Sequence, residues 1–414
     1  MRFSYHLLTN ISWFFLRIIA LINSKIRLFV KGRKTVFKVL SDKIQKQDRT
    51  IWIHAASLGE YEQGLPIIEQ LKDTYPEHKM VLTFFSPSGY EVKKDSSPVD
   101  VVTYLPMDTL GNAKKLVQLI RPELAIFIKY EVWPNYLSEL QTRNIPTLLV
   151  SAIFNERQAY FKFYGRFLRK ALGCFTHIFA QDQQSKSLLQ SLGLEQISVG
   201  GDTRFDRVTR ILQQDNSLDF MTEFKDNNKC FVAGSTWRPD EDIIIDYINS
   251  AETQLKYVIA PHTIKSKTIQ KLQKSITKKT VCFSSIKGSN LKETQVLIID
   301  TIGLLTKIYS YADISYVGGG FETGLHNTLE PAVFGKAVII GPNYHGFKEA
   351  EDLVALGGIL PIQDQHDFEG MMQELQQDPV FAQETGGINK KYIQDQLGAT
   401  TTIMDYIKTV INQE

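Results

Sequence analysis

Two loops in the first half of the chain carry acidic residues that could take part in proton transfer. The segment HAASLGE at 54–60 follows a short apolar run, leads into a helical pattern and ends in Glu60. A carboxylate held at the edge of a cleft can act as general base toward a hydroxyl nucleophile. The same spacing fits a capping box between Ser57 and Glu60, which would be a structural role. A second acid, Glu131, comes just past another apolar run and could equally form a structural salt bridge.

The second half of the chain has loops of the kind that hold phosphate groups. In GSTWRPDED at 234–242, small residues around Ser235 precede a helix start, where free N–H groups and the helix dipole favour an anion. A plain N-cap at Ser235 is the alternative. The segment APH places Pro261 and His262 after a further apolar run, and another such run is followed by Gly303. His262 alone would more often be a satisfied surface histidine, so each of these loops is a weak signal by itself.

The most distinctive segment runs from Tyr316 to Pro331 and reads YVGGGFETGLHNTLEP. Its glycines would bring backbone donors close to a ligand, although their spacing is not that of a dinucleotide fingerprint. Glu330 is placed to accept both hydroxyls of a ribose, and complementing a helix dipole is its alternative role. The sequence contains no HExxH, Walker lysine or GxSxG motif and no metal-ligand spacing. It therefore argues against a metalloprotease, a P-loop ATPase and a lipase-type hydrolase, and predicts no metal and no cofactor.

These loops must be positioned by sheets, and short apolar runs alternate with helix-length polar segments along the whole body. Most runs are continuous, as expected of strands that helices cover on both faces. The repetition implies parallel βαβ units, so the predicted fold class is α/β with two Rossmann-like domains facing across a cleft. Ligands of such sheets bind outside the carboxyl ends of the strands. The expected strands are Thr50–His54, Met80–Phe85, Val101–Leu105, Leu124–Ile128, Pro146–Val150, His177–Ala180, Ile197–Val199, Cys230–Ala233, Tyr257–Ala260, Val296–Asp300, Ile314–Val317 and Ala337–Ile340.

The domain boundaries follow from where this alternation stops. Residues 208–229 are polar and lack a strand pattern, so they are interpreted as a linker between roughly equal halves. The expected domains are residues 41–207 and residues 230–414, and the last helix is a candidate to pack back on the first domain. Residues 1–40 stand apart as a membrane anchor with a basic flank.

The charge distribution separates the N-terminus from the rest. The 414 residues include 47 Lys or Arg and 45 Asp or Glu, a formal net charge of +2. Eight of the basic residues and none of the acidic ones lie within residues 1–41, which leaves the remainder with a balance of −6. A nucleic-acid-binding surface on the main body is therefore not expected. The hydrophobic content of 43% excludes a disordered chain, and three widely spaced cysteines fit a reducing compartment better than a disulfide scaffold.

The N-terminal segment combines an apolar stretch with a basic one. Residues Phe3 to Ile22 are mostly apolar, but Arg17 lies among them and would cost about 2.5–3.5 kcal/mol at the centre of a bilayer. The basic run from Lys25 to Lys38 would attract anionic head groups at about 1 kcal/mol per residue. We therefore expect attachment to the cytoplasmic side of a membrane, by shallow insertion or by one span. The alternative is an amphipathic helix packed on the protein's own core.

Together and in this order, these motifs resemble those of the 3-deoxy-D-manno-octulosonic acid (Kdo) transferases of lipopolysaccharide synthesis. The resemblance runs from the N-terminal segment to about residue 355 and rests on HAASLGE, YEVWPN, GDTRFD, GSTWRPDED, APH and HNTLEPAVFGKAVIIGPN. It implies the GT-B fold of glycosyltransferases, with an N-terminal domain for the lipid acceptor and a C-terminal domain for CMP-Kdo. The implied reaction moves Kdo from CMP-Kdo to the glucosamine disaccharide of a lipid A precursor (lipid IVA). Inversion of configuration and the cytoplasmic face of the cell inner membrane are implied with it.

The resemblance also implies roles for particular residues. Glu60 matches the general base of the family's S-x-G-E loop, and Glu131 matches the second acid of its E-x-W-P-N motif, which is implicated in acceptor handling. Beside the Ser235 loop, the implied nucleotide contacts are Pro261, His262, Gly303, Asn327, Thr328, Leu329 and Glu330.

The chain departs from the family pattern at several of these positions. It has His262 and Arg204 where arginine and lysine are usual, Gly303-Leu304-Leu305 for G-E-L, and Asn327-Thr328 for N-P. Two other functions stay open at this point. One is a GT-B enzyme that uses a UDP-sugar, whether a transferase or an epimerase, and the other is a membrane-bound scaffold without turnover.

Overall fold

The computed structural model describes residues 2–252, 254–322 and 324–411. The chain divides into two compact units. The first unit comprises Met1–Arg207 together with Leu397–Glu414, and the second comprises Val208–Gln396. The chain therefore passes between the units twice. Each unit has its own parallel sheet and its own cores, in agreement with the α/β class predicted from the alternation of runs.

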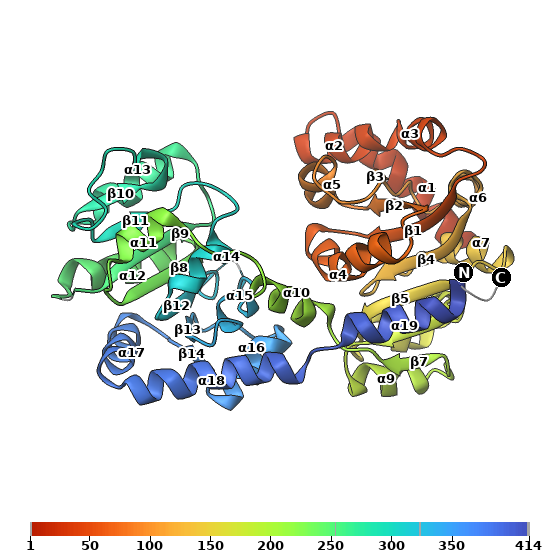
Figure 1. The fold of residues 1–414 in the computed structure, drawn as a ribbon. Coiled ribbons are helices and arrows are strands. Elements are labelled where there is room, and N and C mark those ends of the chain that lie inside the picture. The colour runs from red at the N-terminus through yellow and green to blue at the C-terminus, as the bar shows by residue number, and fades with distance from the viewer. Residues whose placement is uncertain (1, 253, 323, 412–414) are drawn as a thin grey trace. The chain divides into compact units, whose positions relative to one another are not determined.

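The first unit is built on a seven-stranded sheet with the order β3-β2-β1-β4-β5-β6-β7 (Figure 1). Its strands are β1 Arg49–Ala55, β2 His78–Phe84, β3 Val101–Tyr104, β4 Pro122–Ile128, β5 Thr147–Ala152, β6 His177–Ala180 and β7 Ile197–Val199. All neighbours are parallel, and the central strands are almost fully buried because helices cover both faces. The strand order reverses between β1 and β4, which is where doubly wound sheets bind their ligands.

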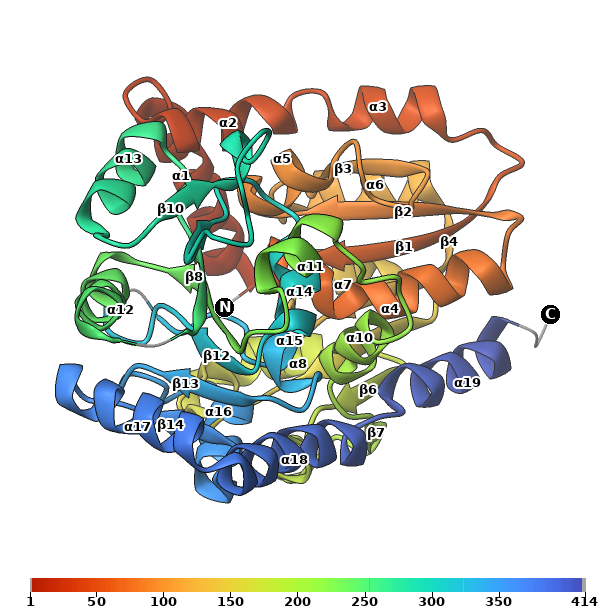
Figure 2. The ribbon, with the colours of Figure 1, turned by 60° about the vertical axis from the view of Figure 1, so that its left-hand side comes forward.

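Helices from along the chain cover the two faces of this sheet, each with its own hydrophobic core. One face packs against α3 Val36–Lys43, α6 Leu110–Ile120, α7 Pro134–Thr142, α8 Arg166–Leu172 and α9 Gln183–Gln190. The other packs against α4 Leu58–Thr74 and α19 Ala399–Ile411, which lie side by side in Figures 1 and 2. The remaining elements of this unit's body are α5 Pro87–Lys93, η1 Ala159–Phe161 and η2 Phe163–Gly165. Helix α10 Thr203–Ile211 begins in this unit and continues into the second.

Helix α19 belongs to the first unit although it lies at the end of the chain. Its apolar side chains are buried in the same core as those of α4. The carboxylate of Asp206 in α10 accepts hydrogen bonds from the N–H groups of Gly398 and Thr400 at 2.8 and 2.6 Å. These bonds cap α19, since its first N–H groups have no partner within the helix. The structure therefore does not place residues 230–414 in one domain.

The N-terminal segment forms α1 Arg2–Ile19, α2 Ser24–Arg33 and α3. Val36 of α3 is fully buried in the core. Arg33 is only 6% exposed: its guanidinium carbon lies 3.5 Å from the centre of the Phe29 ring, and it donates to the Phe85 carbonyl at 2.7 Å. A separate anchor covering residues 1–40 is therefore not what the structure shows, because the second half of this segment is built into the first unit.

Helix α1 is tied to the first unit at both ends. The Tyr5 hydroxyl donates to the Asp108 carboxylate at 2.7 Å. At the other end, the Arg27 guanidinium donates to the carbonyls of Ala20 and Leu21 at 3.0 and 2.7 Å, which satisfies free carbonyls at the helix end. Within the residues that the structure describes, no helix is both long and apolar enough to cross a bilayer.

The second unit repeats the plan, with a seven-stranded parallel sheet in the order β10-β11-β9-β8-β12-β13-β14. Its strands are β8 Cys230–Thr236, β9 Lys256–Pro261, β10 Thr280–Cys282, β11 Val296–Ile298, β12 Ile314–Val317, β13 Ala337–Ile340 and β14 Ile359–Pro361. Here the order reverses between β8 and β12. Each strand expected from the sequence coincides with an observed one. The strands that were missed, β10 and β14, are three-residue strands at the sheet edges.

Helices again cover both faces of the second sheet. They are α11 Asp219–Lys225, α12 Arg238–Ser250, α13 Ser266–Ser275, α14 Leu305–Ile308, α15 Leu329–Ala332, α16 Lys348–Leu356, α17 Gln365–Gln377 and α18 Pro379–Asp395, with the turns η3 Phe283–Ser285 and η4 Tyr309–Tyr311. The interpretation of residues 208–229 as a linker is wrong for α11. Its Met221 and Phe224 are fully buried in the core beneath β8. Three apolar residues in a seven-residue helix give too weak a pattern to reveal this packing.

Candidate active site

Glu60 lies in the first turn of α4, just beyond the carboxyl end of β1. Ser57 is the N-cap of this helix, and its hydroxyl oxygen accepts from the Glu60 N–H at 3.5 Å. One oxygen of the Glu60 carboxylate accepts a hydrogen bond from the Ala56 N–H. The capping interaction predicted from the spacing is thus present, but the carboxylate reaches one residue further back than in the usual capping box. Glu60 is also only 6% exposed, which a capping role alone does not require.

Glu131 follows β4, the neighbour of β1 across the reversal of strand order, and is 8% exposed. Its Oε2 accepts from the Trp133 indole N–H at 2.8 Å and lies 3.3 Å from Nε2 of His54. His54 is fully buried, with Nδ1 at 3.0 Å from the Thr83 carbonyl oxygen. An indole and an imidazole therefore hold Glu131, rather than the lysine or arginine of an ordinary salt bridge. Among the described residues, its second carboxylate oxygen has no hydrogen-bond partner.

The two carboxylates influence one another. Burial raises the pKa of Glu60 to about 8, and the negative charge of Glu131 adds to the rise. The Ala56 N–H and the positive charge of Lys129 lower it again, but by less. Lys129 has a φ of 68°, a conformation that non-glycine residues adopt rarely and that often marks a functional loop. A carboxylate whose pKa lies near the ambient pH can take a proton from a hydroxyl and later release it.

The segment GDTRFD supports the helix that carries Glu60. Asp202 is 6% exposed, forms an ion pair with Arg204 at 2.7 Å and accepts from the Gln63 amide at 3.4 Å. The Thr203 hydroxyl donates to the Gln63 carbonyl at 2.5 Å. Gln63 lies one turn beyond Glu60, so these bonds fix the first turns of α4. The sequence motif served only as a family signature, and its supporting role becomes visible once the chain is folded.

In the second unit, Asp240 joins two loops that are far apart in the sequence. Its carboxylate accepts from the N–H groups of Trp237 and Gly319 at 2.8 and 3.0 Å and from the Tyr316 hydroxyl at 2.7 Å. These loops follow β8 and β12, the strands beside the reversal of order. The protein's own carboxylate therefore occupies N–H groups that were expected to be free for a phosphate. Ser235 is not the N-cap of α12 either: it lies in a bulge of β8 with φ 55°, and Trp237 takes the N-cap position.

Trp237, His262 and His326 form an aromatic stack beside these loops. The ring centres of Trp237 and His262 are 4.5 Å apart, and those of His262 and His326 are 4.7 Å apart. The Trp237 indole N–H donates to Nε2 of His326 at 2.9 Å. Burial lowers the pKa of His326 to about 4, and the charge of His262 contributes, so His326 stays neutral at physiological pH. His262 follows Pro261 at the end of β9 and is exposed, but it is packed into this stack rather than isolated.

Trp237 is the member of this stack that lines a pocket of 890 Å³ in the second unit. Thr236 and Trp237 line it from the loop after β8, and Thr263 lines it from the loop after β9. Arg238, Lys271 and Lys274 add positive charge to its walls. The pocket therefore has the flat ring, the hydroxyls and the cations that a nucleotide-type anion needs.

Glu330 is held by two side chains from different loops. Its Oε2 accepts from the Thr306 hydroxyl at 3.0 Å, and its Oε1 accepts from the Asn327 amide at 3.1 Å. Thr306 lies in α14, just after the exposed loop at Gly303, where φ is 94°. The structure thus brings the Gly303 loop to Glu330, which the sequence could not show. Each Glu330 oxygen keeps a further lone pair for a ligand hydroxyl.

Three predicted residues of this region have other surroundings. Leu329 is fully buried, and its N–H already donates to the Asn327 side chain at 3.2 Å, which leaves it little to offer a nucleotide. Thr328 is 1% exposed, and its buried hydroxyl has no hydrogen-bond partner among the described residues. In the glycine-rich turn, a Cβ at Gly318 would lie 2.5 Å from the Ser235 carbonyl oxygen. Glycine is needed there for packing between loops rather than for the approach of a ligand.

Comparison with known proteins connects these motifs to a family. Residues 31–207 match the family model of 3-deoxy-D-manno-octulosonic acid transferases (Kdo transferases). The chain is 28% identical over 378 residues to the 3-deoxy-D-manno-octulosonic acid transferase of Haemophilus influenzae, which covers 88% of this chain and 87% of that protein. The protein of the same name from Aquifex aeolicus is 29% identical over 315 residues, or 74% of this chain and 80% of the relative.

Solved structures agree on the fold. The UDP-GlcNAc 2-epimerase of Neisseria meningitidis, in a crystal structure with bound UDP-GlcNAc, gives a TM-score of 0.62 at 13% identity and covers 87% of this chain and 100% of its own. At this identity the match speaks for the GT-B-like fold and not for the reaction. The family model over residues 31–207 and the relatives in sequence confirm the resemblance predicted from the motifs: the chain is similar to the Kdo transferases.

Proposed function

We propose that this protein moves Kdo from CMP-Kdo to the glucosamine disaccharide of a lipid A precursor, with inversion at the anomeric carbon, and that Glu60 is its general base. The observation that carries the proposal is the buried Glu60 carboxylate beside Glu131 at the reversal of strand order. Glu60 takes the proton of the acceptor hydroxyl as its oxygen bonds to the anomeric carbon. The bond from that carbon to the phosphate of CMP breaks on the opposite face, and CMP leaves with the electron pair.

Glu131 positions the acceptor in this proposal. The Trp133 indole and His54 hold one of its oxygens, which leaves the other to accept from a sugar hydroxyl. Its negative charge also makes Glu60 a stronger base, because the charge disfavours the ionised form of Glu60. Glu60 is therefore the base in this proposal, and Glu131, held by Trp133 and His54, positions the acceptor.

The donor is bound by the second unit. Glu330 accepts hydrogen bonds from the ribose hydroxyls and Asn327 donates to them. Trp237, which stacks on His262, lines the 890 Å³ pocket. His262 takes the place of a family arginine, so the leaving phosphate relies more on the neighbouring lysines of α13. Pro261 and the loop at Gly303 complete the proposed contacts.

The test is turnover by the purified full chain with CMP-Kdo and lipid IVA, with the products weighed by mass spectrometry. Addition of Kdo to the lipid supports the proposal. The folds of the solved relatives make a UDP-sugar epimerase the second candidate, so UDP-GlcNAc is offered in parallel. Epimerisation of UDP-GlcNAc without any transfer of Kdo would replace the proposal by that candidate.

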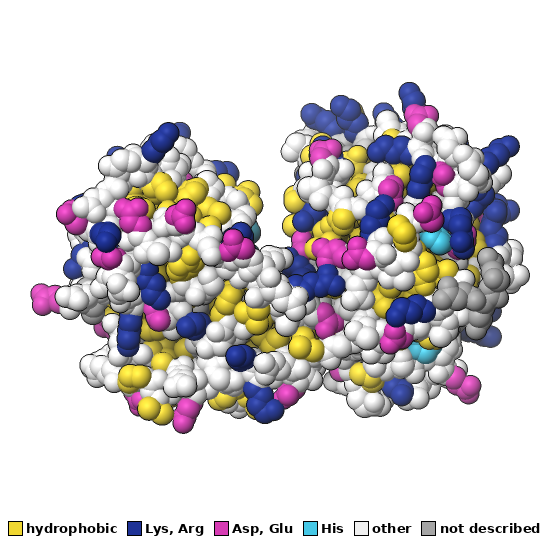
Figure 3. Space-filling model, viewed as in Figure 1, with side chains coloured by type: hydrophobic (Ala, Val, Ile, Leu, Met, Phe, Trp, Pro, Cys, Tyr) yellow, Lys and Arg dark blue, Asp and Glu magenta, His cyan; other side chains and the backbone are white. Residues whose placement is uncertain are grey.

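We further propose that the protein works on the cytoplasmic face of the inner membrane, lying on the bilayer through α1. The large exposed hydrophobic residues of α1 are spaced as one helical face and comprise Leu7, Leu8, Ile11, Phe14, Phe15 and Ile18. Lys25, Lys31, Lys34 and Lys38 of the following segment are exposed. Figure 3 shows Lys and Arg side chains gathered over α2 and α3. An apolar helix face next to cations is the arrangement that binds anionic lipid surfaces.

Flotation with liposomes tests the membrane proposal. The protein should float with vesicles that contain anionic lipid, and the variant Phe14→Ser/Phe15→Ser should stay in the dense fraction. The variant Val92→Ser, which changes another exposed apolar residue of the first unit, is the control and should still float. Flotation of the double variant at the level of the unchanged protein would overturn the proposal.

A further inference from the structure

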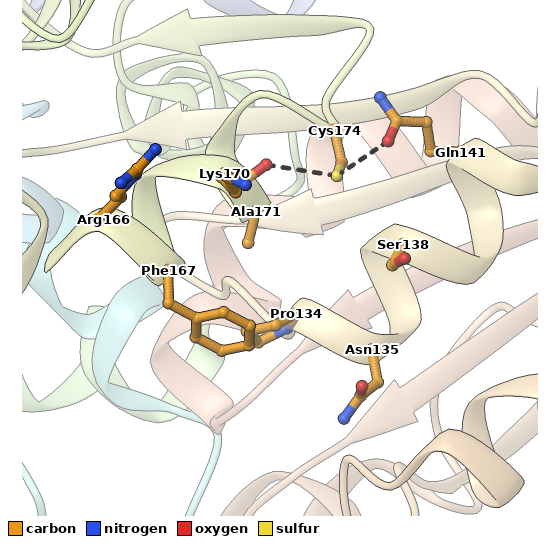
Figure 4. Close-up of a pocket in the computed structure, with 9 residues that line it drawn as sticks. All are labelled: Pro134, Asn135, Ser138, Gln141, Arg166, Phe167, Lys170, Ala171 and Cys174. Carbon is orange, nitrogen blue, oxygen red and sulfur yellow. Dashed lines mark hydrogen bonds between the residues drawn. The ribbon is translucent and has the colours of Figure 1, made fainter. Parts of the chain in front are cut away.

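A pocket of 480 Å³ lies between α7 and α8 of the first unit (Figure 4). Pro134, Ser138 and Gln141 line it from α7, and Arg166, Phe167 and Lys170 line it from α8. Figure 4 shows the Phe167 ring beside Pro134, and Gln141 and Cys174 close together at the other end. None of the predicted site residues lines this pocket, but α7 begins directly after Glu131 and Trp133.

The charge of this pocket has one sign. Arg166 and Lys170 are one helical turn apart and exposed, and neither forms an ion pair with a described residue. Arg169, by contrast, is used within the fold, where it donates to the carbonyls of Tyr160 and Lys162 at 3.0 Å. No Asp or Glu is among the pocket's lining residues. Two free cations with a neighbouring hydroxyl and amide are suited to an anion with several oxygens.

The apolar side of the pocket continues into α1. The rings of Phe167 and Tyr5 lie 5.2 Å apart, and Tyr5 is in turn bonded to Asp108. Asp108 accepts from the N–H groups of Asn135 and Tyr136 at the start of α7. The pocket therefore adjoins the Tyr5 end of α1 on one side and, through Asp108, the start of α7 next to the loop of Glu131 on the other. A ligand that fits both is an amphiphile with an anionic head.

We propose that this pocket binds a phosphate group of the lipid acceptor through Arg166 and Lys170. The inference rests on the proposed function, because it assumes that the acceptor is a phosphorylated lipid sugar. The phosphate holds the disaccharide near the loop of Glu131, and its acyl chains extend along α1. Removing the two cations should weaken acceptor binding without touching the donor or the two carboxylates.

Cys174 gives a direct readout of whether the pocket is filled. It lines the pocket and is partly exposed, whereas Cys230 and Cys282 are buried. Burial raises the pKa of the Cys174 thiol, so labelling with N-ethylmaleimide is carried out at mildly alkaline pH. Phosphorylated lipid acceptor at ten times its dissociation constant should slow labelling about tenfold. Acceptor from which the phosphates have been removed, in the same detergent, should leave the labelling rate unchanged.

A matched pair of variants gives the kinetic test. Arg166→Glu/Lys170→Glu should raise the KM for the lipid acceptor at least about tenfold and leave the KM for CMP-Kdo within twofold. Lys114→Glu/Lys186→Glu makes the same change in net charge elsewhere on the first unit and should leave both values unchanged. With dephosphorylated acceptor, the Arg166/Lys170 variant and the unchanged protein should have the same KM.

The outcomes separate this inference from the proposed function. If the unchanged protein transfers Kdo but the acceptor does not protect Cys174, or if the Arg166/Lys170 variant keeps its acceptor KM, the pocket assignment is overturned and the function stands. If no Kdo is transferred but the phosphorylated lipid still protects Cys174, the function is wrong and the pocket stands. Equal protection by inorganic phosphate alone would assign the pocket to free phosphate and overturn the acceptor subsite.

Discussion

The two units share one plan but differ in the chemistry placed where the strand order reverses. In the first unit, β1 and β4 lead to Glu60 and Glu131, two buried acids. In the second, β8 and β12 lead to Trp237 and a glycine-rich turn, and His326 beside them is neutral. The same backbone geometry thus presents two buried carboxylates in one unit and a flat ring surface in the other. The fold sets where a ligand binds, and the loops set what happens to it.

A closer comparison separates a reactive acid from a structural one. Burial raises the pKa of both Glu60 and Asp240. Asp240 accepts three hydrogen bonds, from Trp237, Gly319 and Tyr316. Its carboxylate therefore has a structural role in holding these loops together. Among the described residues, Glu60 accepts only from the backbone N–H groups of Ala56 and Ser57, and it has another acid as its neighbour. Glu60, a buried carboxylate with fewer hydrogen bonds than Asp240, is therefore the better candidate for catalysis.

The largest effect expected from this contrast is on Glu60. Glu60→Gln keeps the shape and an oxygen for the Ala56 N–H but cannot take a proton, so kcat should fall by about 10²–10⁴-fold. Calorimetric titration with CMP should give an unchanged affinity. Ser57→Ala is the control, because it removes the cap and costs about 1 kcal/mol of stability but leaves the base in place. Equal rates for Glu60→Gln and Ser57→Ala would leave Glu60 with a capping role only.

The next effect concerns the ring surface of the second unit. Trp237→Ala removes both the ring that stacks on His262 and the donor to His326, so CMP should bind about 3- to 10-fold more weakly, the value of one lost aromatic contact. Affinity for the lipid acceptor should stay the same. His345→Ala, at an exposed histidine outside the stack, serves as control. If Trp237→Ala weakens binding of the lipid acceptor and not of CMP, the proposal that the second unit binds the donor is wrong.

A pH profile sharpens the comparison further. The base works when ionised, and the pKa of Glu60 is raised to about 8, so kcat/KM should increase with pH and level off above that value. Glu131→Gln removes a negative charge that raises this pKa, so the inflection should move to lower pH. Asp240→Asn in the second unit should not move it. If the inflection of the Glu131→Gln variant stays at the same pH or moves to higher pH, the charge of Glu131 does not raise the pKa of Glu60.

The smallest expected effect is on stability, and it tests the closure of the first unit by α19. Asp206→Ala leaves the N–H groups of Gly398 and Thr400 uncapped and should lower the free energy of unfolding by about 1–2 kcal/mol. Urea denaturation followed by fluorescence in a Trp237→Phe background reports on the tryptophans of the first unit alone.

The control for this measurement lies on the same helix. Asp405 is exposed and pairs only with Lys408, so Asp405→Ala should change stability by less than about 0.5 kcal/mol. A loss in Asp206→Ala no larger than in Asp405→Ala would show that the cap does not hold α19 in place.

Local patterns were enough for the sheets and for the acids of the first unit. Continuous apolar runs predicted every long strand, since strands buried on both faces have no polar alternation. Glu60 and Glu131 could be found because each directly follows such a run. The edge strands and α11 escaped because a few apolar residues carry too little periodicity.

Contacts across the sequence could not be predicted in the same way. The bond from Gly319 to Asp240 and the one from Thr306 to Glu330 depend on the order of strands, which a single sequence does not specify. The burial of Leu329 has the same origin, because this first residue of α15 becomes core only when β12 and β13 pair. The motifs gave the candidate residues, and the topology decided which of them lie together and which are buried.

The closure of the first unit by α19 has a consequence for biosynthesis. A ribosome releases the sheet of the first unit long before it reaches residue 399, and in between it makes the whole of the second unit. During that interval the face later covered by α19 is open, whereas the second unit has all of its own segments and can fold as a unit. A chain broken off before its final helix would therefore keep an intact second unit attached to an unfinished first one.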